Sequence, residues 1–162
     1  MQPELEAFLY EAEERYLSQE EIQDFQAHID RFKQRLATYE NLREGEIAIF
    51  QPVADRLSEK FPTEKDDILE QALKHWLAVM RYSAMAMLLN NPEFLQRRLL
   101  EWLTPSIQAH QLETVEKKLY ELLQKQLKEL LPEEQLALMQ PFLEQAKTNL
   151  LANALSGVGG QG

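Results

Sequence analysis

The chain has three histidines and no cysteine. Cysteine thiolates, which often bind metals or act as nucleophiles, are therefore absent, and the histidines are the remaining candidates for such chemistry. A bundle that binds two iron ions places Glu-x-x-His pairs on inward helix faces. The residues three positions before the histidines are Phe25, Ala72 and Ile107, so that pattern is absent. There is no glycine-rich phosphate loop, and three histidines among many acids do not indicate a catalytic set. We therefore expect neither a catalytic centre nor a metal site.

The negative charge of the chain limits its partners. It has 162 residues, enough for one domain with a sizeable core, and its formal net charge is −10. Such a charge repels a phosphate backbone, which excludes nucleic acid as a partner, and it disfavours an anionic membrane surface. No apolar stretch is long enough to cross a bilayer, so we expect no transmembrane segment.

Apolar residues recur at helical spacing along the whole chain, which predicts an all-α fold of seven or eight helices and no sheet. Ser18 and Glu21 form a capping-box pattern before a long helix. Gly45 interrupts that helix, and Thr63 is expected to cap a central helix that is apolar on most sides. The long helix carries a one-sided apolar stripe at Ile22, Phe25, Ile29, Phe32, Leu36 and Tyr39.

The later part of the chain adds further helices and a short tail. We expect one helical domain over residues 1–156 and a flexible tail over 157–162, because glycine is concentrated there. Charged residues near position 116 predict a solvated helix face with ion pairs at helical spacing. That face comprises Glu113, Glu116, Lys117, Lys118 and Glu121.

Several short motifs, in a fixed order, resemble those of the phycobiliproteins, the light-harvesting family of cyanobacteria. Each motif is weak alone, but their order and spacing run without a gap from about residue 11 to 110. The segments that carry the resemblance are Glu11–Ser18, Glu21–Phe25, Glu59–Pro62, Ala72–His75, Arg81-Tyr82 and Asn90-Asn91, followed by Arg98 and Leu103.

The resemblance implies a globin-like helical fold from which an N-terminal helical pair, within residues 1–45, projects. In the family this projection joins two subunits, and an acid at its end pairs with an arginine on the partner's central helix. The matching residues here are Glu11 and Arg81, which become candidate interface residues. The implied partner is a related subunit or a second copy, in a dimer.

The pigment site of the family is degenerate in this sequence. The family attaches its bilin to a cysteine where this chain has Ala72, and it holds the pigment with an arginine and an aspartate where this chain has Lys74 and His75. A neutral imidazole offers one acceptor where a carboxylate accepts two N–H bonds. We therefore expect no covalent bilin and no resident cofactor, with Lys74 and His75 as candidates for weak, non-covalent binding.

These expectations favour a non-enzymatic interaction subunit that acts in assembly, scaffolding or regulation of the phycobilisome or a photosystem. It would be cytoplasmic, at the cytoplasmic (stromal) face of the thylakoid membrane, where protein partners would hold it at the periphery. One alternative is a carrier or sensor of a non-covalent tetrapyrrole, bilin or haem, near Lys74 and His75. Another is a helical bundle unrelated to photosynthesis.

Overall fold

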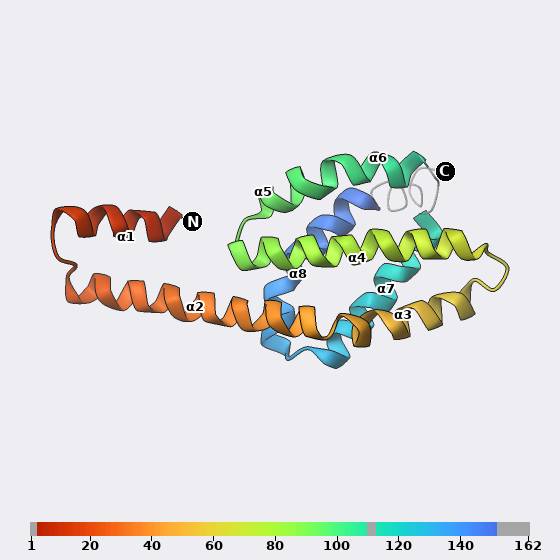
Figure 1. Cartoon of the computed structure of the whole chain (residues 1–162), viewed down its shortest axis with the longest axis horizontal. Coiled ribbons are helices and arrows are strands. Elements are labelled where there is room, and N and C mark those ends of the chain that lie inside the picture. Colours follow the sequence, from red (N-terminus) through yellow and green to blue (C-terminus); the bar gives the residue numbers. More distant parts are fainter. Residues whose placement is uncertain (1–2, 110–112, 152–162) are drawn as a thin grey trace, which may run out of the picture.

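The computed structural model describes residues 3–109 and 113–151, and within them every regular element is a helix. The chain has an all-α, globin-like phycobiliprotein fold with a projecting N-terminal helical pair (Figure 1). The predicted helices are thereby confirmed, whereas His110 and the tail at 157–162 lie outside the described residues. The elements are α1 (Pro3–Glu14), α2 (Gln19–Glu44), α3 (Glu46–Lys60), α4 (Asp66–Leu89), α5 (Pro92–Leu95), the π-helical turn η1 (Gln96–Leu100), α6 (Glu101–Ala109), α7 (Glu113–Leu130) and α8 (Glu133–Leu150).

The projecting arm consists of α1 and the first part of α2, which lie side by side away from the body (Figure 1). The predicted capping box is present, because Ser18 accepts a hydrogen bond from the Glu21 backbone and the Glu21 carboxylate accepts one from the Ser18 backbone. Arg15 also donates to Glu21, and these bonds lower the pKa of Glu21 to about 2. The tight turn therefore directs α1 back along α2, where Phe8 packs edge-on against Phe25.

The body is built around α4, which packs against α2, α3, α7 and α8. Trp76 lies at its middle and is fully buried, with Tyr120 of α7 5.2 Å away between ring centroids. Most other core residues are leucine, isoleucine, valine, methionine and alanine. This composition explains why α4 is apolar on most sides, as a helix at the centre of a fold must be.

One buried arginine fastens α2 to α4 where the arm meets the body. Arg35 is buried, and its Nε donates to the carbonyl of Leu88 at 3.3 Å. Carbonyls in the last turn of a helix have no partner within the helix and carry partial negative charge. Arg35 therefore satisfies one of these carbonyls, while its guanidinium lies 5.8 Å from the Phe32 ring centroid.

The helix ends follow the turn residues with one exception. Asn90 adopts the left-handed conformation after α4, and Asn91 caps α5 with Pro92 at its first turn. Thr63, however, does not cap α4. The helix begins at Asp66 with Lys65 as its N-cap and no side-chain cap, so that prediction was wrong. In the described ranges no helix has the length and apolar character needed to span a bilayer.

We predict that Gly45→Ala destabilises the fold by about 1–2 kcal/mol. Gly45 separates α2 from α3, and a β-carbon there would lie 2.9 Å from the carbonyl oxygen of Asn41, which is backbone and cannot rotate away. Thermal unfolding followed by circular dichroism measures the loss. Glu44→Ala, at an exposed neighbouring position, is the matched control; equal stability of the two variants would contradict the clash.

Candidate functional site

Ala72, which the sequence resemblance matches to the family's pigment-bearing cysteine, lies inside the core. Its side chain is fully buried on α4, close in sequence to the fully buried Trp76 and the buried Leu69. A thioether-linked pigment needs its attachment atom at the wall of an open cleft. The structure therefore places this position among core side chains, and the chain has no cysteine anywhere.

His75 points at a buried carboxylate on the facing helix. Its Nδ1 lies 2.9 Å from Oε1 of Glu116 on α7, and Glu116 is fully buried. Burial raises the pKa of Glu116, and the hydrogen bond from His75 acts in the opposite direction. The second oxygen, Oε2, and the indole Nε1 of Trp76 are both buried and have no hydrogen-bond partner among the described residues. His75 thus serves a polar contact between two helices.

Glu116 is the residue that the sequence reasoning misplaced. The sequence predicts it on a solvated face, but it is buried, while the ion pair at 3.6 Å between the half-buried Lys118 and the exposed Glu121 fits that prediction. The signal was present, because position 116 lies beside Val115 and one turn before Leu119, on the apolar side of α7. A carboxylate at such a register needs a polar partner, and His75 supplies it.

Lys74 lies in a different environment from His75, its neighbour in the sequence. It is 73% exposed, lies 3.2 Å from Glu70, and lines an open groove of about 290 Å³ between α3 and α4. The groove has apolar walls, including Phe50 and Leu77, and His75 is not among its lining residues. The two candidate pigment contacts therefore do not share this groove.

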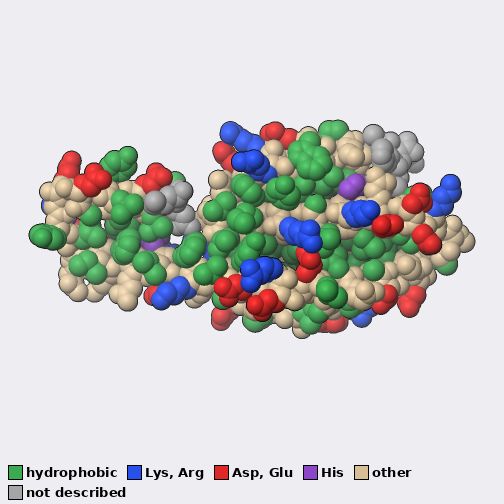
Figure 2. Space-filling view, viewed as in Figure 1, with side chains coloured by type: hydrophobic (Ala, Val, Ile, Leu, Met, Phe, Trp, Pro, Cys, Tyr) green, Lys and Arg blue, Asp and Glu red, His purple; other side chains and the backbone are tan. Residues whose placement is uncertain are grey.

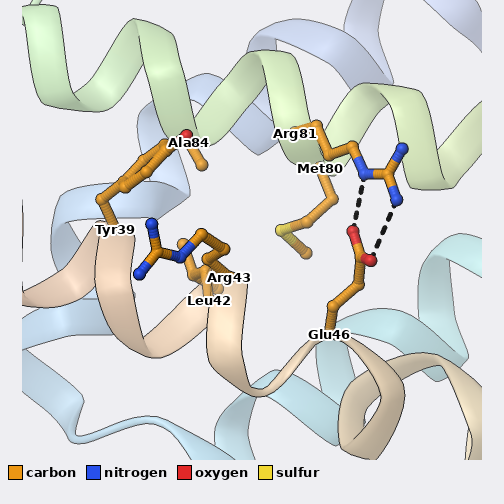
Figure 3. A pocket seen from close by; sticks show the side chains of 7 residues that line it. All are labelled: Tyr39, Leu42, Arg43, Glu46, Met80, Arg81 and Ala84. Atoms are coloured by element: carbon orange, nitrogen blue, oxygen red, sulfur yellow. Dashed lines mark hydrogen bonds and ion pairs between the residues drawn. The ribbon is translucent and has the colours of Figure 1, made fainter.

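Arg81 and Glu11 each have an ion-pair partner within the chain. Arg81 on α4 donates twice to Glu46 at the start of α3, at 2.7 and 3.0 Å (Figure 3). This contact lowers the pKa of Glu46 and raises that of Arg81. Glu11, on the arm, accepts from Arg15 at 2.6 Å. Both candidate interface residues are exposed and hydrogen-bonded internally in the single chain.

The Arg81–Glu46 pair forms one side of a pocket of about 260 Å³. Met80 and Leu42 are buried in its wall, and Figure 3 shows the Arg43 guanidinium on the side opposite the ion pair. The pocket thus combines an apolar wall with two guanidinium groups and the carboxylate of Glu46. Such a site suits an acidic side chain that is flanked by apolar ones.

Comparison with known families identifies the class of protein that this fold represents. The model of the phycobilisome protein family matches residues 9–150, which is most of the chain. The chain belongs to the phycobilisome protein family, as a member without the bilin-attachment cysteine. A search of curated proteins gives no match.

We predict that Glu116→Gln makes stability less dependent on pH. The folded state raises the pKa of Glu116 above 4.5 by burial, so its contribution is present below that pH and is lost as the pH rises through the folded pKa. Glutamine removes the charge and keeps an acceptor for His75. The melting temperature of the variant minus that of the parent should therefore increase from about pH 5 to about pH 8, because only the parent loses this stability as the pH rises.

The matched control is Glu121→Gln, which removes an exposed carboxylate from the same helix. Its difference from the parent should change little over that pH range. A constant difference for Glu116→Gln would show that the Glu116 carboxyl does not contribute to the pH dependence.

Proposed function

We propose that this protein is a non-enzymatic interaction subunit without covalent bilin, which acts in assembly, scaffolding or regulation of the phycobilisome or a photosystem. The observation that carries the proposal is an arm with apolar side chains exposed along it. Exposed apolar surface of this kind marks a site where another subunit binds and covers it. Membership of the phycobilisome protein family supports a related subunit, or a second copy, as that partner.

The apolar stripe of α2 is only partly covered by α1. Phe25 is half-buried against Phe8, whereas Ile22, Ile29 and Phe32 are exposed, Phe32 by 39%. Figure 2 shows apolar side chains along the arm and, in a broad patch, over the body. Ile47, 78% exposed, carries apolar surface onto α3. A partner that lies along the arm and this face would remove both surfaces from water.

The pocket beside Arg81 is the proposed receptor for an acid on the partner's arm. Arg81 is 62% exposed, so a second carboxylate can reach it while Glu46 remains bound. In a pair of identical chains that carboxylate is the partner's Glu11, released from Arg15. We therefore keep Glu11 and Arg81 as the proposed interface pair, with Arg43 as an additional cation in the same pocket.

The proposed context is the cytoplasmic face of the thylakoid membrane, where protein partners would hold the subunit. The alternative, a carrier of a non-covalent tetrapyrrole, has one supporting observation, the apolar groove beside Lys74. The hydrogen bond between His75 and Glu116 disfavours it, because His75 would have to leave a buried carboxylate unpaired to reach a pigment. Titration with biliverdin or haem, read by absorbance, separates the two functions: a saturable spectral shift supports the carrier.

We predict that Phe32→Glu weakens subunit pairing by about tenfold to a hundredfold, because burial of one phenylalanine contributes roughly 1.5–3 kcal/mol. Arg81→Glu should also weaken pairing, since it opposes the incoming acid with a like charge. Sedimentation velocity measures pairing of the chain alone and in mixtures with purified phycobilisome proteins.

The matched control for Phe32→Glu is Lys33→Glu, which introduces the same glutamate at the next, exposed position of the helix. It should leave pairing unchanged. The interface is wrong if Phe32→Glu and Lys33→Glu behave alike, or if the parent associates neither with itself nor with phycobilisome proteins.

A further inference from the structure

A groove lined mainly by lysines lies on the part of the body formed by α7 and α8. It measures about 360 Å³, and its lining includes one carboxylate, Glu121, beside four ammonium groups. Its wall contains the buried Tyr120, whose ring centroid lies 5.4 Å from Nζ of Lys147. The four lysines are Lys117, Lys125, Lys128 and Lys147.

This local charge is unusual in a chain whose net charge is −10. Two copies repel each other at long range, so a cationic patch at the point of approach favours a close contact between them. None of the residues that line the lysine groove lines the Arg81 pocket, and they come from different helices. The lysine groove is therefore a second charged surface, separate from the proposed pairing surface.

The matching anionic element is α1. It contains five glutamates and no lysine or arginine, and it has no buried residue. Glu4 lies 3.7 Å from His28, and Glu11 bonds Arg15, so these two face α2 and the turn. Glu6 and Glu13 are exposed and have no ion pair with a described residue.

The spacing of the two charge sets agrees. Glu6 and Glu13 are two helical turns apart, about 10 Å along the axis, and Lys117 and Lys125 are about 12 Å apart. From these observations we propose that the lysine groove between α7 and α8 binds helix α1 of a second copy of this chain. Glu6 and Glu13 of that copy pair with Lys117 and Lys125, and Tyr10, 72% exposed, lies between them on the arm.

Such a contact is heterologous, because α1 of one copy meets a different surface of the next. Heterologous contacts continue into rings or open chains unless something closes them. The arm projects from the body, so α1 can reach a second molecule (Figure 1). The proposal extends the proposed function from pairing to higher-order assembly, and it uses different residues, so that the two can fail independently.

The test is sedimentation velocity of the full chain with charge-swap variants. In about 0.1 M salt the parent should form species larger than a pair. In about 1 M salt these should dissociate, because the screening length falls from about 10 Å to about 3 Å. The double variants Lys117→Glu with Lys125→Glu, and Glu6→Lys with Glu13→Lys, should each lose the larger species. An equimolar mixture of the two double variants should regain association.

The matched control is Lys60→Glu with Lys65→Glu, which makes the same charge change at exposed positions outside the groove. It should keep the larger species. The proposal is overturned if the parent shows no salt-sensitive assembly, or if the mixture does not associate. It is also overturned if Lys117→Glu with Lys125→Glu loses assembly while Glu6→Lys with Glu13→Lys keeps it, since the acid that binds the groove would then come from elsewhere. Phe32→Glu should weaken pairing and keep the salt-sensitive contact, which separates this proposal from the first.

Discussion

The arrangement of the molecule depends on one continuous helix that belongs to two parts. α2 has 26 residues, about 39 Å, and only its C-terminal part packs on the body. Its apolar stripe does not end where the body ends, and α1 is too short and too acidic to cover the remainder. Arg35 fixes the angle of the arm by binding the end of α4. The fold therefore holds an apolar surface in an extended position away from the body.

The centre of the body combines close apolar packing with one buried polar contact. Ala72 and Trp76 on α4 are fully buried, and Trp76 packs against Tyr120. His75 and Glu116 then satisfy part of each other's hydrogen-bonding needs between two helices. A buried carboxylate with one partner stabilises a fold weakly, but removal of that partner is costly. The residues around the family's attachment position are thus explained by packing and by one polar contact.

Apolar periodicity predicts the helices, the spacing of Ser18 and Glu21 predicts the capping box, and Gly45 predicts the break, because all three depend on local interactions. Thr63 was misassigned because a threonine two residues too early matches the same capping pattern. Glu116 was misassigned because its neighbours Glu113, Lys117 and Lys118 are charged, and a local reading gives them one face. Its partner His75 is 41 positions away, so the contact depends on how α4 meets α7.

The ion pair at Arg81 has a limited energetic role in any assembly. Arg81 already holds Glu46 with two hydrogen bonds, so an incoming carboxylate shares or exchanges a partner and adds little net energy. Burial of the apolar stripe contributes more, since the exposed part of the stripe on α2 contacts water in the single chain. The stripe should therefore supply the affinity, and the charged groups should set the register and exclude wrong partners.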